Sequence, residues 1–534
     1  MIPSYQRGPQ TPLIEKTIHE VVRDSAARLP DHEAVVSRHQ NRRLTWSEFQ
    51  RESERVAAGL AGLGLKAHER VGLWSSNCVE WLLIQVACSR ANLELVNVNP
   101  AYRATDLGYI LRKSRMRALI LRERDARSEY KKILEETEAA PEHVVYLDHP
   151  SWDAMLAGGT EIANAPATSD DIANIQYTSG TTGAPKGVLL AHRGIVNNGW
   201  YGAERMQFSE RDRLLVNLPL YHVGGCVCWA VAAYHAGSTI VLPSAQFDAL
   251  ASLQAIDEER ITVGGGVPTM LIAMLEHPEF AKFDYSSLRL VPTGAAPCPV
   301  DLMERAVSRT GAKNVFIFYG QTEASGGITT SVPGDSVDLA ASTVGRVYPN
   351  TEIKIISPSG DTLPVGEQGE ICARGAIVMK GYDQEPEATA RAIDAEGWLH
   401  TGDLGVMWPD GYFNITGRAK EMIIRGGENI FPREIEDFLI AHPKISDVQV
   451  IGLPDAKLGE AVLCWIRLKA GETATEDEIR AYCQGRIAHF KIPQFFRFVT
   501  EFPMTVTGKV QKFAIREMEI RERGLEAVSR ARMA

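Results

Sequence analysis

The feature that most constrains the fold is a regular alternation of short apolar strands with helices along most of the chain. Thr45 and Glu48 form a capping box, and the apolar spacing behind them predicts a helix that ends by Gly64. Strands alternating with helices in this way predict an α/β fold with parallel sheets. The expected strands are 71–74, 93–98, 118–121, 214–218, 239–242, 261–263, 288–291 and 314–318.

The pattern changes twice in the last third of the chain. Beyond Gly345 short β segments separated by turn signals predict a small β-rich subdomain that completes a large N-terminal domain. A compact α+β unit then begins, with Pro432 at the first position of a helix. These patterns place a domain boundary somewhere between Gly402 and Gly427.

Composition excludes several classes of protein. The formal net charge of −10 argues against a nucleic-acid partner. Eight cysteines without a C-x-x-C pair indicate free thiols in a reducing cytoplasm. Residues 1–15 lack the apolar core of a signal peptide. The uncharged run 214–247 is broken by prolines and glycines, and about 14 apolar residues fall short of a transmembrane helix.

The stretch 177–187 is the strongest motif. It packs four Ser and Thr hydroxyls and three glycines between two apolar segments. Glycines let successive N–H groups converge on one anion, hydroxyls add donors, and Lys186 adds positive charge. The pattern differs from a Walker loop. A flexible surface loop is the alternative, but this density of donors favours a polyphosphate cradle.

This stretch resembles the phosphate-binding signature of the AMP-forming adenylating (ANL) superfamily. That superfamily comprises acyl-CoA synthetases, peptide-synthetase adenylation domains and beetle luciferases. The resemblance implies that ATP is bound by this loop and that Thr178 also contacts the metal. The implied nucleotide-binding residues are Thr178, Ser179, Gly180, Thr181, Thr182, Gly183 and Lys186.

A second motif, 319–323, follows an apolar strand, and ligands of open α/β sheets bind at such strand ends. An aromatic face can stack on a purine, a hydroxyl can reach a phosphate, and a carboxylate can hold Mg²⁺. The resemblance implies that Tyr319 stacks on adenine, Thr322 contacts the α-phosphate and Glu323 binds the metal. The backbone strip that borders adenine and the acyl carboxylate is matched by Gly294, Ala295 and Ala296, and Gly320 is a further implied nucleotide-binding residue.

Five residues in the last quarter of the chain are each weak signals alone, since turn formers and surface charges are common. In the resembled family, Asp403 and Arg418 bind the ribose hydroxyls, and Lys509 stabilises charge as the carboxylate attacks the α-phosphate. Lys420 matches a hinge about which a mobile C-terminal domain turns, which sharpens the predicted domains to 1–419 and 420–534. Gly427 matches the glycine of the pantetheine tunnel.

The resemblance implies a two-step acid–CoA ligase that uses ATP, Mg²⁺ and coenzyme A. A carboxylate and ATP give acyl-adenylate and pyrophosphate, and the thiol of coenzyme A then displaces AMP. Segments 98–103, 422–429 and 489–493 most resemble medium-chain fatty acyl-CoA synthetases, and His222 matches a gate beside the acyl pocket. Small and apolar residues around 264–268 and 200–201 fit an apolar acyl tunnel.

Several alternatives stay open. They are a ligase that loads a carrier protein, an aryl-acid CoA ligase, a luciferase-like oxygenase and a non-catalytic nucleotide-binding regulator. Retention of both Glu323 and Lys509 argues against the regulator, because AMP binding alone needs neither. The expected partners are a small carboxylic acid and coenzyme A, the expected location is the cytoplasm, and a homodimer is left open as the assembly.

Overall fold

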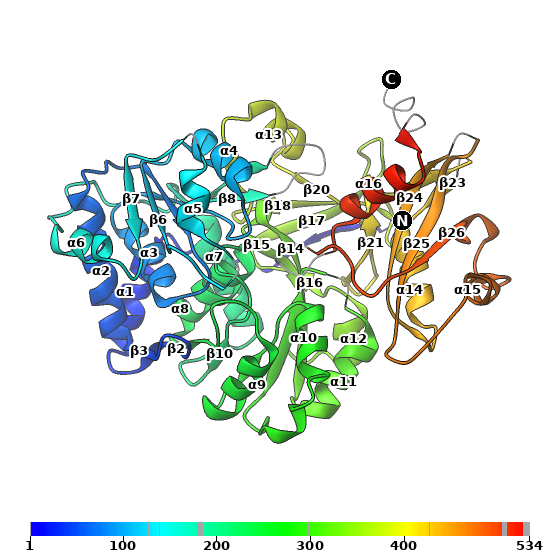
Figure 1. Cartoon of the computed structure of the whole chain (residues 1–534), viewed down its shortest axis with the longest axis horizontal. Helices are drawn as coiled ribbons and strands as arrows, with labels where there is room; N and C mark the ends of the chain where they lie inside the picture. Colours follow the sequence, from blue (N-terminus) through cyan, green and yellow to red (C-terminus); the bar gives the residue numbers. More distant parts are fainter. Residues whose placement is uncertain are drawn as a thin grey trace. The chain divides into compact units, whose positions relative to one another are not determined.

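The computed structural model describes residues 2–126, 128–137, 139–178, 185–296, 298–426, 428–455, 457–504 and 510–526, and Figure 1 traces them. The chain forms two compact units. The large unit consists of Tyr5–Lys354 and Cys372–His400. The small unit consists of Met1–Ser4, Ile355–Ile371 and Thr401–Ala534.

The chain passes between the units within three strands, β17 (Thr351–Ile356), β18 (Gly369–Gly375) and β20 (Leu399–Met407). These strands agree with the β-rich region predicted beyond Gly345. The boundary predicted near Lys420 is a hinge. Dividing the chain into compact units does not test where a hinge lies. That boundary therefore stays a prediction.

A seven-stranded sheet of the large unit carries the 177–187 motif. Its order is β19-β9-β8-β5-β4-β6-β7, and the five strands from β8 to β7 are parallel. The antiparallel strands β9 and β19 close one edge. The strands are β4 (Arg70–Trp74), β5 (Glu94–Asn97), β6 (Ala118–Leu121), β7 (His143–Tyr146), β8 (Ile172–Thr178), β9 (Lys186–Ala191) and β19 (Gly381–Tyr382).

A nine-stranded sheet carries the 319–323 motif. Its order is β16-β15-β14-β13-β12-β10-β11-β2-β3, with parallel pairing from β14 to β2. Antiparallel strands lie at both edges. The strands are β2 (Glu33–Ser37), β3 (Arg42–Thr45), β10 (Arg213–Leu215), β11 (Thr239–Leu242), β12 (Val263–Gly264), β13 (Leu290–Gly294), β14 (Asn314–Gln321), β15 (Gly326–Thr330) and β16 (Arg346–Val347).

Helices cover these sheets in the large unit (Figure 1). Thr45 caps α2 with Glu48 as predicted, and α3 is buried almost throughout because its sequence is apolar on every side. A short β1 (Tyr5–Arg7) pairs with β17. The helices are α1 (Ile18–Arg28), α2 (Trp46–Gly62), α3 (Val79–Arg90), α4 (Ala104–Ser114), α5 (Tyr130–Glu135), α6 (Pro150–Ala157), α7 (His192–Arg205), α8 (Ala232–Ala236), α9 (Ala249–Glu258), α10 (Pro268–Leu275), η2 (Phe280–Lys282), α11 (Val300–Thr310), η3 (Thr322–Ala324), α12 (Val337–Ser342) and α13 (Pro386–Ala392).

The uncharged run 214–247 contains a π-helix, η1 (Gly224–Val231), which continues as α8. Gly237 ends α8 with a positive φ of 73°, a conformation that glycine adopts without a Cβ clash. Periodicity alone predicted only an apolar helix, because π and α turns differ by one residue. In the described part of the chain, no helix combines the length and apolar character needed to cross a bilayer.

The small unit has its own core around the long β24–β25 hairpin. Side chains alternate between its two faces: Val450 and Cys464 pack with α14 and α15, while Ile451 and Leu463 pack with α16. From Pro432 onward the helices and strands are of the α+β kind predicted for this part of the chain. The elements of the small unit beyond β20 are β21 (Phe413–Arg418), η4 (Ala419–Glu421), β22 (Ile423–Arg425), β23 (Glu428–Ile430), α14 (Pro432–Ile440), β24 (Ile445–Asp455), β25 (Gly459–Leu468), α15 (Glu476–Cys483), η5 (His489–Lys491), β26 (Phe495–Phe498) and α16 (Lys512–Glu522).

Candidate functional site

The 177–187 motif joins two antiparallel strands, β8 and β9. Thr178 is opposite Lys186 in their register, so the two flanks of the loop are adjacent. A Cβ at Gly187 would lie 3.2 Å from Cβ of Asp383, which is tight packing that favours glycine. The predicted residues Ser179, Gly180, Thr181, Thr182 and Gly183 lie outside the described residues.

Lys186 and Glu323 are linked through one tyrosine, Tyr382 of β19. The Lys186 ammonium lies 5.0 Å from the centre of the Tyr382 ring, and the Tyr382 hydroxyl donates to Glu323 Oε1 at 3.0 Å. Burial, together with the Glu323 carboxylate, raises the pKa of Tyr382 well above its usual range. The hydroxyl therefore stays protonated and remains a donor to the carboxylate.

A buried ion cluster supports this tyrosine. Arg70 donates to both carboxylate oxygens of Asp383, at 2.8 and 2.9 Å, and its Nε donates to Glu94 at 2.9 Å. The backbone N–H of Asp383 donates to the carbonyl of Gly187 at 2.7 Å. Burial opposes the charge of Arg70, but its hydrogen bonds to Asp383 and Glu94 raise its pKa. The cluster thus fixes β19, and with it Tyr382, against β9.

The residues of the 319–323 motif lie at the end of β14 and in the following turn η3. The strand end predicted for Tyr319 lies beside the 294–296 strip, because Gly294 of β13 pairs with Phe318 of β14 and the two strands are parallel. A Cβ at Gly320 would lie only 1.9 Å from the carbonyl of Gly326, so this position requires glycine. Ala295 has a positive φ of 64°.

Three predicted residues from distant segments, Thr178, His222 and Thr322, line one pocket of the large unit. Its volume of about 20 Å³ is enough for one water molecule. The segment 98–103, one of those that resemble medium-chain synthetases, contributes Asn99. The lining residues are Asn97, Asn99, Gln176, Tyr177, Thr178, Tyr221, His222 and Thr322.

Two of the residues that line this pocket, Asn97 and Gln176, belong to a ladder of buried amides. Gln176 donates to Asn174 at 2.6 Å, Asn174 donates to Asn97 at 2.9 Å, and Asn97 donates to the carbonyl of Tyr221 at 3.0 Å. Burial raises the pKa of the neighbouring Cys226 thiol to about 12, so this thiol stays neutral. Fully paired buried amides hold their geometry rigidly, which fixes the segment that carries His222.

The residues expected to line an acyl tunnel make packing contacts and hydrogen bonds with other segments of the large unit. A Cβ at Gly265 would lie 1.9 Å from the carbonyl of Pro292, so this glycine allows close approach to β13. Tyr201 is buried, and its hydroxyl accepts from Asn350 at 2.8 Å. Trp200 packs edge-on against His235. An acyl tunnel along these segments stays a prediction.

In the small unit, Asp403 and Arg418 are opposite each other on β20 and β21. Arg418 Nε lies 2.8 Å from Asp403 Oδ1; the carboxylate side chain is 5% exposed and the arginine side chain 52%. The pair predicted to bind ribose is thus assembled within this unit. Lys420 belongs to η4, while Gly427 and Lys509 lie outside the described residues.

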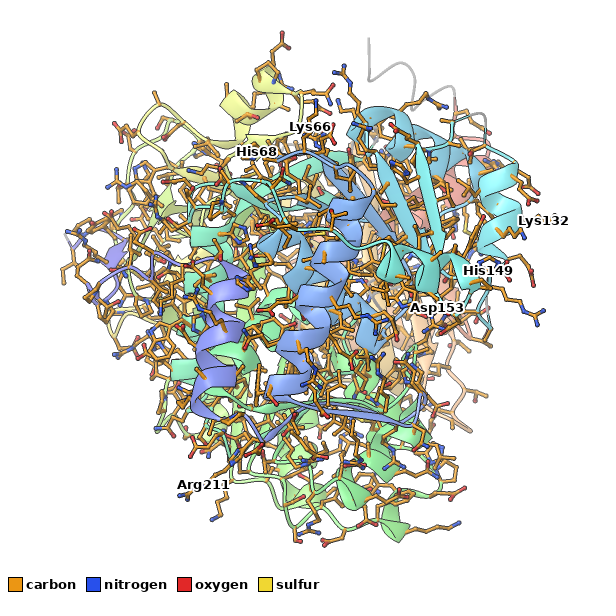
Figure 2. All side chains as sticks on the ribbon, turned by 90° about the vertical axis from the view of Figure 1, so that its left-hand side faces the viewer. Lys66, His68, Lys132, His149, Asp153 and Arg211 are labelled. Atoms are coloured by element: carbon orange, nitrogen blue, oxygen red, sulfur yellow. The ribbon has the colours of Figure 1, made fainter. Side chains whose placement is uncertain are left out.

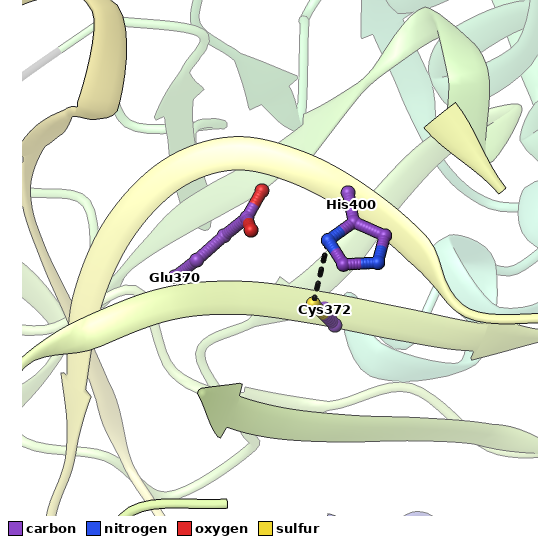
Figure 3. Close-up of side chains that lie close together, drawn as sticks. All are labelled: Glu370, Cys372 and His400. Carbon is purple, nitrogen blue, oxygen red and sulfur yellow. Dashed lines mark hydrogen bonds between the residues drawn. The ribbon is translucent and has the colours of Figure 1, made fainter. Parts of the chain in front are cut away.

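One thiol–imidazole contact in the large unit was not expected from the sequence. Cys372 Sγ lies 3.7 Å from His400 Nδ1 (Figure 3), and His400 Nε2 lies 3.7 Å from Asp394. Glu370, drawn in the same figure, belongs to the small unit and accepts from the N–H of Gly402 at 3.1 Å. None of these side chains lines the pocket of Thr178 and His222.

The sequence matches two models of known protein families. The model described as AMP-binding enzyme covers residues 22–383, which is more than half of the chain. The chain belongs to the AMP-binding enzyme family. The C-terminal domain model of the same family matches residues 434–509. Membership confirms the family and the fold class predicted from the motifs.

Relatives of this AMP-binding enzyme match nearly its whole length. The putative acyl-CoA synthetase YngI of Bacillus subtilis is 41% identical, covering 95% of this chain and 98% of its own. The human mitochondrial medium-chain acyl-CoA ligase ACSF2 is 38% identical, covering 96% and 89%. ATP-bound MatB from Rhodopseudomonas palustris superposes with a TM-score of 0.85 at 29% identity, covering 94% and 99%.

Sequence reasoning missed Tyr382, Asp383 and Arg70 in this AMP-binding enzyme. Tyr382 and Asp383 lie in a two-residue edge strand, and Arg70 begins a strand more than 300 positions earlier. A charged residue at the start of a buried strand is a weak signal that it has a buried partner. Nothing in the local pattern names that partner, because the contact depends on sheet order.

Proposed function

We propose that this protein is an AMP-forming medium-chain acyl-CoA synthetase. A fatty carboxylate attacks the α-phosphate of ATP to give acyl-adenylate and pyrophosphate, and the thiol of coenzyme A then loses its proton and displaces AMP. The observation that carries the proposal is the link between Lys186 and Glu323 through Tyr382, at the base of the donor-rich loop. The acyl-CoA synthetases and ligases among the relatives support the same reaction class.

The donors at this site fit ATP with Mg²⁺. Magnesium takes one or two protein carboxylates and completes its shell with phosphate oxygens and waters. Glu323 is half-buried and supplies the carboxylate, and Thr178 supplies a hydroxyl in the pocket that Thr322 also lines. When bound, the metal neutralises phosphate charge. Lys186 attracts the β- and γ-phosphates, and Tyr319 offers its ring to adenine.

The small unit completes the proposed reaction. Asp403 and Arg418 would hold the ribose, with the carboxylate accepting from its hydroxyls and the guanidinium donating to it. Lys509 would provide positive charge to the reacting α-phosphate, and a turn about Lys420 would bring Gly427 to the pantetheine arm for the second step. His222 lines the same small pocket as Thr178 and Thr322, and we propose that it acts there as a gate between acid and thiol channels.

We also propose a cytoplasmic location. All eight cysteines are free thiols, and six of them are buried. Free buried thiols are typical of proteins kept in a reducing compartment. The vertebrate ACSF2 relatives are named as mitochondrial proteins. The homodimer stays an open prediction.

The proposed reaction predicts a coenzyme A-dependent release of AMP that peaks with medium-chain acids. The test compares acetate, octanoate, palmitate and benzoate, each with and without coenzyme A. We expect the highest kcat/KM with octanoate and little AMP release without the thiol. A preference for benzoate would favour the aryl-acid ligase. Release that requires a phosphopantetheinylated carrier protein instead of coenzyme A would favour the carrier-loading ligase.

Tyr382→Phe is expected to raise the Mg²⁺ concentration for half-maximal adenylation about tenfold, because a hydrogen bond to a charged group contributes about 1.5 kcal/mol or more. The ring contact with Lys186 is retained, so the KM for the acid should not change. ATP–pyrophosphate exchange measured over a magnesium titration tests this. The control is Tyr109→Phe, which loses only a 3.2 Å bond to the Pro185 carbonyl. Superimposable titrations for wild type and Tyr382→Phe would refute the positioning role.

A further inference from the structure

A second cavity in the large unit has no role in the proposed reaction. Its volume is about 520 Å³, within the range of about 300–1,000 Å³ that is usual for small-molecule sites. It shares no lining residue with the pocket of Thr178 and His222. We call it the α2–α6 cavity. Its lining residues are Arg42, Arg51, Glu52, Arg55, Val56, Leu83, Trp152 and Leu156.

Two glycines of α2 allow this helix to pack closely against α6, which also lines the cavity. A Cβ at Gly59 would lie 3.0 Å from the carbonyl of Met155, and one at Gly62 would lie 2.2 Å from the carbonyl of Gly158. The two helices therefore touch at their C-terminal ends. The lining residues of α2 precede these contacts, while the two of α6, Trp152 and Leu156, lie on either side of Met155 in the sequence. Figure 2 faces this side of the unit, where the labelled His149 and Asp153 mark α6.

The charges around the cavity are unequal, with three arginines against one glutamate. Arg42 is already neutralised, since it pairs with Glu80 at 2.6 Å and also with Glu52. Among the described residues, Arg51 and Arg55 form no ion pair and are exposed. The acid one turn before Arg51, Glu48, instead caps α2 by accepting from the N–H of Thr45 at 2.9 Å.

Arg51 and Arg55 are four residues apart on one helix, so they lie on the same face with Cβ atoms about 5–6 Å apart. A guanidinium matches a carboxylate with two parallel N–H donors, and two guanidinium groups at this spacing can share one anion. The remaining wall is apolar and aromatic, formed by Val56, Leu83 and Trp152 together with Leu156.

We propose that the α2–α6 cavity binds a carboxylate that carries an apolar chain. The carboxylate lies between Arg51 and Arg55, and the chain lies against Val56, Leu83 and the Trp152 indole. This is a second acyl-anion site, separate from the adenylation site, and the count of two bound octanoate molecules in its test rests on the medium-chain reaction proposed above. The ligand needs both its charge and its apolar chain, because one part of the cavity wall carries arginines and the other part is apolar.

The test is isothermal titration of the full-length protein, without nucleotide, using octanoate as the probe. We expect two octanoate molecules per wild-type chain. Arg51→Gln combined with Arg55→Gln should weaken one of the two by on the order of tenfold to a hundredfold, because two charge-assisted contacts are lost. The matched control is Lys66→Gln with Arg211→Gln, two exposed cations of the same unit labelled in Figure 2. It should keep both sites.

Further ligands and one further variant separate the contribution of the carboxylate from that of the apolar chain. Octanol, which lacks the charge, should not occupy the cavity, and Trp152→Ala should weaken octanoate at this site alone. Octanoate binding that is the same in wild type and in the Arg51/Arg55 variant would overturn the proposal. A single octanoate per wild-type chain that the variant loses would support this cavity and contradict the medium-chain specificity proposed above. Octyl phosphate binding there in place of octanoate would also overturn the carboxylate assignment. Unchanged thermal unfolding of the variants excludes misfolding as the cause of a lost site.

Discussion

Lys509→Ala is expected to slow acyl-adenylate formation by about 10²–10³-fold while largely sparing thioester formation from a supplied acyl-adenylate. A preorganised positive charge at the reacting phosphate contributes about 3–4 kcal/mol to such a transition state. In the second half-reaction AMP leaves, and the family resemblance assigns that step to a different orientation of the C-terminal domain. ATP–pyrophosphate exchange measures the first step, and coenzyme A-dependent consumption of synthetic octanoyl-AMP measures the second.

Two matched variants make this result specific. Gly427→Trp should do the reverse, sparing exchange and blocking the coenzyme A step, because a large side chain would fill the proposed pantetheine tunnel. Lys469→Ala removes an exposed lysine of the small unit and should leave both steps unchanged. Equal loss of both half-reactions in Lys509→Ala would contradict its assignment to adenylation.

Arg70→Met should destabilise the large unit by about 3–5 kcal/mol, because it leaves Glu94 and Asp383 as buried carboxylates without their cation. The side chains of Arg70, Glu94 and Asp383 are 18%, 12% and 5% exposed, so water replaces little of the lost pairing. Urea unfolding followed by tryptophan fluorescence measures the loss as a lower transition midpoint. The KM for ATP should also rise, since Asp383 fixes β19 against Gly187.

A compensated variant tests the electrostatic origin of this loss. Arg70→Met combined with Glu94→Gln and Asp383→Asn removes the two stranded charges and should recover most of the stability. If the single and triple variants unfold at the same urea concentration, the loss comes from packing around Arg70. If Arg70→Met unfolds at the wild-type midpoint, the cluster does not hold β19 in place.

Much of the fold could be predicted because local patterns and tertiary structure agree. The strands at 118–121 and 239–242 were predicted with the bounds that the structure shows. Capping boxes and apolar periodicity act over a few residues, so a sequence displays them directly. The strand predicted at 214–218 is only Arg213–Leu215, and the apolar helix behind it begins as η1, because packing between layers overrides local preference there.

The residues of the candidate site were likewise predicted only in part. Tyr319 and Glu323 were predicted from an aromatic and a carboxylate at the end of an apolar strand. Arg70, Asp383 and Tyr382 were missed, although they hold the predicted Lys186 and Glu323 in place. Their contacts join β4, β9 and β19, whose order in the sheet is not a local property of the chain.

The sequence by itself determined the family, the donor-rich loop and the residue types suited to ATP. Those features depend on side-chain chemistry and on the conformational freedom of glycine, which neighbouring residues express without the rest of the molecule. Only the tertiary structure decided that Tyr382 connects Lys186 to Glu323, and that Arg51, Arg55 and Trp152 border one cavity. Such contacts arise when packing and sheet order bring distant segments together.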